Sequence, residues 1–373
     1  MIRMDVTVII PLYNGSPWIK QTLSSIHAQI HSPREILVVD DGSTDTSPGT
    51  VRDFEDATLL QSPGDGAGTA RHVGLKRAST ELVAFLDQDD VWHPEHLSRL
   101  SSVLQKHPQA PVAVAQETAF RAPSAPSYHV DEAPSERFDP WDRFPLNSIA
   151  TPSCALIRRA ALRRIDGWPH AYSTSDFHAW FKLSVHGAFR RARQVTVGKR
   201  HHDANTLESF RRDPIPYLQD RIDACGDALE HRRDHRADVP HKFQDRLNLL
   251  EAIGGVFTGA LRADHHRLIE SACRIERSEV DAEMREAIAN FAMFMFEPRI
   301  DGSRSEQSAF LERLVRYWPD DCPEARTLFY GAVARTVLSG WSFLDCLTRR
   351  PTRRAAWTLA ARAASVRLRR RAR

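Results

Sequence analysis

The sequence predicts an α/β fold, in which a doubly wound and mainly parallel sheet is followed by a helical region. Two observations predict it. Short runs of β-branched and aliphatic residues, typical of strands buried on both faces, recur along residues 6–114. Segments with helical spacing of apolar residues lie between these runs. Strands that alternate with helices in this way are typical of a parallel sheet covered by helices on both faces.

The expected elements follow one another closely in the first half of the chain. Apolar residues with helical spacing begin at Ile19 and continue through Ile30, and a later expected helix has Pro94 in its first turn. Residues 121–152 are rich in proline and poor in aliphatic residues, which predicts a long irregular segment near the site. Strands are expected at 6–10, 35–40, 58–61, 81–86, 112–114 and 154–158, and further helices at 68–78, 94–107, 159–165 and 176–186.

Three parts are expected along the chain. Residues 1–212 carry the α/β pattern, residues 213–348 are predominantly helical in pattern, and residues 349–373 form a basic tail. The tail contains ten arginines and no acid, so its positive charge exceeds the net charge of +3 for the whole chain. The remaining chain is therefore net acidic, and no nucleic-acid partner is expected for it.

Cysteine usage and the amino terminus indicate a cytoplasmic protein. The five cysteines are odd in number, widely spaced and without a CxxC pair, which disfavours a disulfide framework or a cysteine zinc site. The apolar run that begins at Val6 is too short for a signal peptide. The longest apolar stretch, residues 247–261, is interrupted by polar residues and is too short to span a bilayer.

Acidic residues follow two of the expected strands, at the edge where open α/β sheets bind ligands. Asp40 and Asp41 follow the second strand, and Asp87 and Asp89 follow the fourth. Acids gathered at one rim repel one another unless a cation is bound there. Either motif alone is typical of a solvated turn. Together they predict a divalent metal, Mn²⁺ or Mg²⁺, whose remaining ligands come from water and a diphosphate.

With these motifs the chain resembles the inverting glycosyltransferases of family 2, which have the GT-A fold. The resemblance is dense to about residue 105 and looser to about residue 206. It implies a GT-A nucleotide-sugar glycosyltransferase domain that moves a sugar from a nucleotide-diphosphate donor, with UDP favoured, to a hydroxyl of a glycan or glycolipid. The matching segments are residues 8–14 (VIIPLYN), 38–45 (VVDDGSTD), 68–74 (GTARHVG) and 85–90 (FLDQDD).

The resemblance also implies roles for residues of the nucleotide site. The acid at Asp41 is expected to accept a hydrogen bond from the base, typically uracil. The main chain near Pro11 and Tyr13 is expected to border that base. Arg71 is expected to support the nucleotide and the metal-binding acids.

The implied metal ligands are Asp87, which also contacts the nucleotide sugar, and Asp89, the more direct of the two. The segment Arg200-His201-His202 resembles the family's Arg-x-His segment, so His202 is a candidate third ligand to metal or phosphate. A surface histidine is an equally good interpretation of His202 from the sequence alone.

The candidate catalytic base is Asp176. It opens an expected helix, where an ordinary acid favoured by the helix dipole is also common. An inverting transfer needs one base to take the acceptor proton, so one carboxylate suffices. Ser175 stands where the family commonly has a first acid, and His72 where it commonly has Asn. Asp166 is the alternative base.

Other interpretations are weaker. A sugar-1-phosphate nucleotidyltransferase would carry a basic, glycine-rich loop after the first strand, where this chain has Pro-Leu-Tyr-Asn. A catalytically silent binding module with this fold is disfavoured because the acids Asp87, Asp89 and Asp176 are all present.

Other motif classes are missing from the sequence. No P-loop or dinucleotide fingerprint occurs, and the motif of the family's processive members is missing after the candidate base. His231 and His235 lie one helical turn apart without the Glu of HExxH, which favours a solvated helix face over a zinc site.

The arginine-rich tail suggests a location. Residues 349–373 could form a helix with a narrow apolar face and arginines elsewhere, so anionic lipid would attract it mainly by charge. The expectation is a peripheral enzyme at the inner face of a bacterial membrane, acting in surface polysaccharide or glycolipid synthesis. A disordered tail that aids solubility is the alternative.

Overall fold

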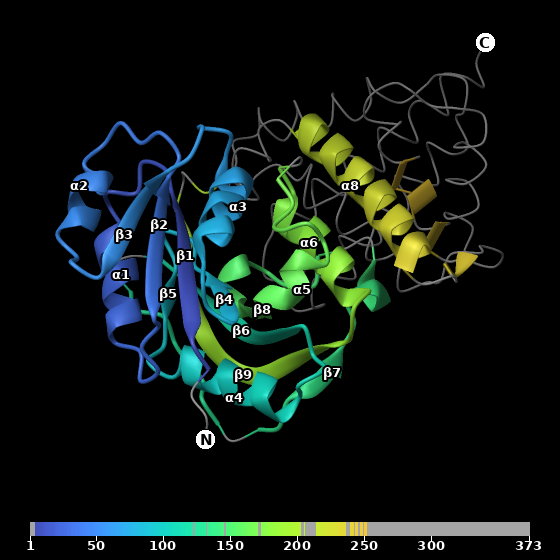
Figure 1. The fold of residues 1–373 in the computed structure, drawn as a ribbon, viewed down its shortest axis with the longest axis horizontal. Helices are drawn as coiled ribbons and strands as arrows, with labels where there is room; N and C mark the ends of the chain where they lie inside the picture. The colour runs from blue at the N-terminus through green and yellow to red at the C-terminus, as the bar shows by residue number, and fades with distance from the viewer. Residues whose placement is uncertain are drawn as a thin grey trace, which may run out of the picture. The chain divides into compact units, whose positions relative to one another are not determined.

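The computed structural model describes residues 4–251 apart from short gaps, and it places them in the fold of Figure 1. The residues outside the description are 1–3, 122–123, 132, 145–146, 171–172, 203–204, 206–213, 236–238, 242, 245–246, 249 and 252–373. The predicted basic tail and most of the predicted helical region lie among these.

The strands and helices alternate through the first half of the chain, as the sequence predicts. The strands are β1 (Val6–Leu12), β2 (Glu35–Asp40), β3 (Ala57–Gln61), β4 (Leu82–Phe85), β5 (Val91–Trp92), β6 (Val112–Phe120), β7 (Glu136–Phe138), β8 (Ala155–Arg158) and β9 (Phe189–Arg200). The helices are α1 (Ile19–His27), α2 (Ser47–Arg52), α3 (Ala67–Arg77), α4 (His96–Lys106), α5 (Arg159–Arg163), α6 (Ser175–Ser184) and α8 (Pro214–His235), with 3₁₀ turns η1 (Pro140–Arg143) and η2 (Pro152–Cys154).

One half of the sheet is the parallel, doubly wound half that the sequence predicts. Its strand order is β3-β2-β1-β4, and all three pairings are parallel. Every residue of β1 is buried, which explains its unbroken apolar sequence. The chain moves outward from β1 to β3 and then returns to the other side of β1 as β4, so a topological switch point lies between β1 and β4.

The other half of the sheet is mixed in direction. β8 lies between β4 and β6 and is antiparallel to both, and β9 pairs parallel with β6. β9 also binds the short strands β5 and β7 in antiparallel pairs. The long strand β9 was not predicted, because arginines and other polar residues interrupt its apolar side chains. A mainly parallel open sheet is therefore confirmed, with an antiparallel insertion.

Helices cover both faces of the sheet. In Figure 1, α1 and α2 lie on one side of strands β1–β3 and α3 lies on the other. α3 packs on β1 and β2, where a Cβ on Gly74 would come within 2.5 Å of Ile9. Glycine at position 74 therefore lets α3 approach β1 closely. Helix α1 ends at His27, and Ile30, expected on its apolar face, is 71% exposed.

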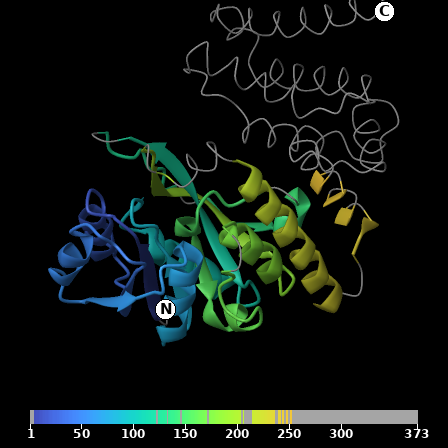
Figure 2. The ribbon, with the colours of Figure 1, turned by 90° about the horizontal axis from the view of Figure 1, so that it is seen from above.

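The chain divides into two compact units, one of residues 1–209 and 223–239 and the other of residues 210–222 and 240–373. The sheet and every site described below belong to the first unit; Figure 2 shows its sheet and helices from above. Among the helices described, none combines the length and the apolar character needed to cross a lipid bilayer. The predicted boundary at residues 212 and 213 stays a prediction.

Candidate functional site

The candidate site lies at the carboxyl ends of β1 and β4. These neighbouring strands are parallel, so the segments that follow them meet at one edge of the sheet, at the switch point. Tyr13 follows β1, and Asp87 follows β4. The side chain of Gln88 joins the two segments: it accepts from the Tyr13 amide at 2.8 Å and donates to the Tyr13 carbonyl at 2.9 Å.

Asp87 is held by three residues from two other segments of the chain. Nη2 of Arg71, from α3, lies 2.5 Å from its Oδ1, and the Thr151 hydroxyl donates to its Oδ2 at 2.9 Å. The Asp87 amide donates to Oγ of Ser153 at 3.0 Å. The Arg71 side chain is 8% exposed. Arg71 is therefore a buried cation that contacts the Asp87 carboxylate.

Asp89 contacts the segment that follows β9. Nε2 of His202 lies 2.8 Å from Oδ2 of Asp89, and the Asn205 amide donates to the same oxygen at 3.2 Å. The His202 ring stacks on Trp18 with centroids 3.9 Å apart. Nε of Arg200 donates to the Asp89 carbonyl at 2.8 Å. The predicted pair Asp89 and His202 is thus brought together across 113 positions of sequence.

Asp90 is a third acid in this cluster, and it is buried. Its carboxyl accepts from the Ser153 hydroxyl at 2.7 Å and from the Arg200 amide at 3.1 Å. Burial raises the pKa of Asp90 well above its ordinary value, and the neighbouring charges of Asp89 and Asp87 raise it further. The sequence offered no reason to separate Asp90 from an ordinary turn residue, because only the fold shows that it is buried.

Asp41, the candidate partner of the nucleotide base, is 7% exposed and accepts from the Ser62 hydroxyl at 2.5 Å and from the Gly66 amide at 2.7 Å. Gly66 has a φ of +95°, a conformation that favours glycine. A carboxylate has about four acceptor positions, so these two bonds leave room for a donor from a bound base. Pro11 is buried at the end of β1, and Tyr13 is 57% exposed.

Asp176 lies in the first turn of α6 and is half-buried. Nδ2 of Asn147 donates to its Oδ2 at 3.2 Å. Its neighbour Ser175 accepts from the Trp168 indole at 3.3 Å, and a Cβ on Gly68 would lie 3.1 Å from the Ser175 Oγ. The first turns of α3 and α6 therefore lie against each other. Because α3 also carries Arg71, contacts connect the Asp87 segment to the helix that bears Asp176.

His72, the residue that replaces the family's usual Asn, faces this same region. Its Nδ1 lies 3.0 Å from the Trp168 carbonyl, and its ring is 4.4 Å from that of His170. Burial is the largest cause lowering the pKa of His72. Asp166, the alternative base, lies in the turn before Trp168 and has a positive φ of 59°. The structure gives Asp166 no contact that favours it over Asp176.

Several residues of the site were missed in the sequence. Thr151 lies at the end of the proline-rich segment that is predicted only as irregular, and Ser153 follows that segment directly. Both contact Asp87 and Asp90. Trp18 and Asn205 complete the surroundings of His202. Polar residues spaced around Pro152 were the available signal, but their partners are distant in sequence and only the fold identifies them.

The donor set fits a divalent cation. Asp87 and Asp89 offer carboxylate oxygens, which Mg²⁺ and Mn²⁺ prefer. Nδ1 of His202 is buried with no hydrogen-bond partner among the described residues, while its Nε2 contacts Asp89. Mutual repulsion of these acids also favours a bound cation.

Comparison with known proteins finds chains of similar sequence. Residues 7–166 match the model of glycosyl transferase family 2. An uncharacterized glycosyltransferase from Nostoc is 39% identical over 108 residues, 27% of this chain and 33% of that protein. The UDP-Glc:alpha-D-GlcNAc-diphosphoundecaprenol beta-1,3-glucosyltransferase WfgD of Escherichia coli is 36% identical over 105 residues, 27% of this chain and 42% of WfgD. The chain spans between a third and two thirds of the length of the relatives matched first.

Solved structures share the fold. Residues 1–349 of TarS from S. aureus, in complex with UDP-GlcNAc, have a TM-score of 0.53 at 19% identity, covering 91% of this chain and 93% of that one. The mannosyltransferase PcManGT from Pyrobaculum calidifontis, in complex with GDP-Man and Mn²⁺, has a TM-score of 0.50 at 19% identity, covering 92% and 89%. Residues 7–166 of this chain are thus similar to glycosyl transferase family 2, and the chain shares the GT-A fold of these solved glycosyltransferases.

Proposed function

We propose that this protein is an inverting, metal-dependent, non-processive glycosyltransferase. It moves one sugar from a nucleotide-diphosphate donor, with a UDP-sugar favoured, to a hydroxyl of a glycan or glycolipid in bacterial surface polysaccharide synthesis. The observation that carries the proposal is the acid cluster at the switch point, where Arg71 contacts Asp87 and His202 contacts Asp89.

The cluster is built for a ligand rather than for stability. Three acids follow one strand within four positions, and two of them raise the pKa of the third, Asp90. Such repulsion destabilises the protein unless a cation relieves it. Arg71 and Arg200 offset part of the negative charge, and both are directed at this loop. A divalent ion held by Asp87, Asp89 and His202 would supply the remaining positive charge and stabilise the leaving diphosphate.

The chain's own residues then have distinct roles. Asp41 accepts from the base, while the backbone near Pro11 and Tyr13 borders it. Asp176 takes the proton of the acceptor hydroxyl as that oxygen attacks the anomeric carbon. The new glycosidic bond forms as the bond from the anomeric carbon to the phosphate oxygen breaks, so the nucleoside diphosphate leaves on the opposite face.

Relatives support the choice of donor and acceptor. WfgD acts, by its name, with UDP-Glc on a diphosphoundecaprenol-linked sugar, and a succinoglycan biosynthesis protein from Rhizobium meliloti is 40% identical over 100 residues. The TarS structure holds UDP-GlcNAc, and the PcManGT structure holds Mn²⁺ with GDP-Man. A lipid-linked acceptor would suit peripheral attachment to the inner face of the membrane through residues 349–373, which lie outside the described residues.

A thermal-shift panel tests the proposal. The full chain is heated with UDP-, GDP- and dTDP-sugars, each with and without Mn²⁺, because a ligand that binds only the folded state raises the melting temperature. We expect UDP-sugars to give the largest rise, and only with Mn²⁺. Asp89→Asn should lose that rise, whereas Asp56→Asn, at an acid that is 58% exposed and paired with His27, should keep it. No Mn²⁺-dependent rise with any donor would contradict the proposal.

A further inference from the structure

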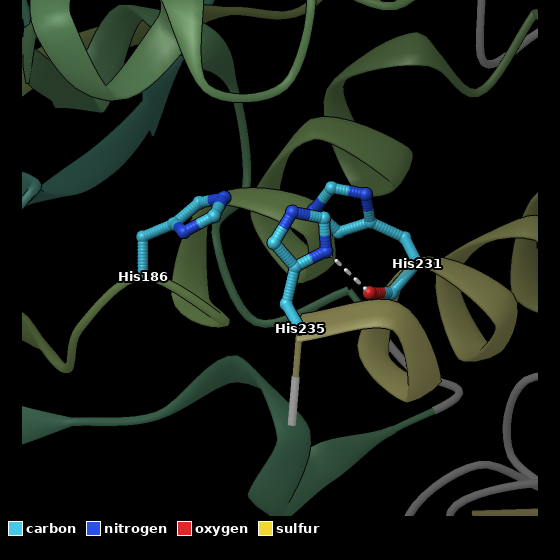
Figure 3. Close-up of side chains that lie close together, drawn as sticks. All are labelled: His186, His231 and His235. Atoms are coloured by element: carbon cyan, nitrogen blue, oxygen red, sulfur yellow. Dashed lines mark hydrogen bonds between the residues drawn. The ribbon is translucent and has the colours of Figure 1, made fainter. Parts of the chain in front are cut away.

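Three histidines far from the acid cluster in sequence come together in the first unit. His186 follows α6, and His231 and His235 lie in the last turns of α8 (Figure 3). One ring nitrogen of each lies within 4.8 Å of the others. The ring centroids are 4.2 Å apart for His231 and His235, and 5.1 and 5.7 Å from His186 to His235 and His231.

We propose that His186, His231 and His235 form a binding site for a transition-metal ion of the Zn²⁺ class, separate from the carboxylate site. Imidazole nitrogen is a preferred ligand for Zn²⁺ and a poor match for Mg²⁺. Histidines four residues apart share one face of a helix, so two ligands come from one rigid element. The sequence alone favours a solvated helix face for this pair, and His186 is the residue that changes the interpretation.

The orientation of His235 is fixed in the way that metal ligands usually are. Its Nδ1 lies 2.9 Å from the carbonyl oxygen of His231. When Nδ1 donates its proton to that carbonyl, Nε2 carries the lone pair that a metal needs, and the ring cannot rotate freely. Figure 3 shows this bond and the His186 ring facing the other two.

His231 offers a nitrogen that nothing else in the described chain uses. Its Nε2 is buried without a hydrogen-bond partner among the described residues. A buried polar atom without a partner is destabilising, and a bound ion would satisfy it.

Charges around the site are balanced enough to admit a cation. The Lys182 ammonium, on α6, is near enough to lower the pKa of His231. It is paired with Asp227, one turn before His231 on α8, at 3.3 Å. Asp227 also accepts from His178 of α6. The negative charge of Asp227 therefore offsets the lysine.

The site would join two elements of the first unit. Three protein ligands leave a tetrahedral ion one position for water or another ligand. Since α6 carries Asp176 and His186 follows it directly, a bound ion would fix the end of α6 to α8. We therefore expect the ion to stabilise the folded state without changing the metal requirement of sugar transfer.

The test is metal binding by the full chain prepared without a histidine tag. Isothermal titration with Zn²⁺ should give one tight site per chain that Mg²⁺ does not displace, and Co²⁺ should give the visible absorption of a tetrahedral complex. His235→Ala and His186→Ala should each weaken Zn²⁺ binding by at least ~100-fold, because each removes a ligand. His235 is exposed near the helix end, so its replacement should leave the fold intact.

Two control variants separate this site from other binding. His27→Ala removes a histidine on α1 that pairs with Asp56, and Asp89→Ala removes the carboxylate site. Both should keep the tight Zn²⁺ site and the Co²⁺ spectrum. Wild-type affinity in His235→Ala and His186→Ala, or loss of the tight site in Asp89→Ala alone, would overturn the proposal. Failure of sugar transfer in every assay would leave this result unaffected, because binding is measured without a donor.

Discussion

The guanidinium of Arg71 lies 2.5 Å from the Asp87 carboxylate, and it also lies 5.8 Å from the centre of the Trp168 ring. Arg71 therefore connects the acid at the end of β4 to the turn before α6. The two side chains are largely shielded from water, since Arg71 is 8% and Asp87 27% exposed. The pair orients Asp87 and limits repulsion among the acids.

Arg71→Ala should lower both stability and donor binding. The substitution removes a charged hydrogen bond and leaves the Asp87 carboxylate without its cation. It should therefore lower the free energy of unfolding by about 2–3 kcal/mol. Urea unfolding measures this loss, and titration with a UDP-sugar in Mn²⁺ measures affinity. Arg71→Lys keeps the charge but not the planar fork, so it should recover part of the stability and less of the donor affinity. Wild-type donor affinity in Arg71→Ala would remove Arg71 from the site.

Asp176→Asn should separate binding from chemistry. The amide preserves the size of the side chain and can keep its contact with Asn147 after rotation. Donor affinity should stay near that of the wild type, while the transfer rate should fall by ~10²–10⁴-fold, the usual contribution of a positioned base. Steady-state kinetics with a competent acceptor measures the rate. A collapse of donor affinity would place Asp176 in the nucleotide site instead, and a normal rate would favour Asp166.

Stability should fall in mild acid because of His96. Its ring is fully buried, lies 4.5 Å from Trp92 and bonds Thr196 at 2.8 Å. Burial lowers the pKa of His96 to about 3, with a smaller effect from His93. The unfolded chain binds a proton at this residue below pH ~6.5, and the folded chain does not until about pH 3. Stability therefore falls as the pH drops through that window.

The expected loss from this one residue is about 1.4 kcal/mol per pH unit below pH ~6.5. Urea unfolding at pH 7, 6 and 5 measures it. His96→Gln, which cannot titrate, should flatten the dependence, although its stability at pH 7 should also be lower because the packing on Trp92 is lost. His27→Gln, at a half-exposed histidine, serves as control. An unchanged pH slope in His96→Gln would contradict this assignment.

The arginine-rich tail should bind anionic membranes. Each basic residue near such a surface contributes about 1 kcal/mol, so partial engagement of ten arginines is sufficient. Co-sedimentation with liposomes that contain anionic lipid should fall steeply with salt and disappear on deletion of residues 349–373. Equal binding to neutral liposomes, or binding that ignores salt, would contradict an electrostatic attachment.

The parallel half of the fold could be predicted because its signals are local. Strands β1, β2 and β4 are apolar runs, and each lies within two residues of its expected position. The strand pairings of the mixed half of the sheet could not be predicted, because they join strands that are distant in sequence. β9 is buried at only about half its positions and is rich in arginine, so its sequence resembles a solvated segment. The short helix α2 was missed because it contains proline and glycine.

The sequence predicts the part of the candidate site that is formed by acidic motifs at the ends of strands. Asp87, Asp89 and Arg71 lie together, and His202 reaches Asp89 from the end of β9. Their supporting residues could not be predicted, because Thr151, Ser153 and Trp18 act through contacts that only the fold creates. The same limit applies to the histidine cluster. His231 and His235 are visible as a helical pair, but His186 joins them from 45 positions earlier in the chain.

Release of UDP from a UDP-sugar tests the central claim most directly. The full chain is mixed with UDP-glucose or UDP-GlcNAc and Mn²⁺, with and without a lipid-diphosphate sugar acceptor, and UDP is quantified over time. We predict acceptor-stimulated release that stops in EDTA, returns with Mn²⁺, and is abolished in Asp89→Ala. The unfolding transition of that variant should stay close to the wild-type one. Full activity of the wild type in EDTA, or of Asp89→Ala in Mn²⁺, would contradict this claim.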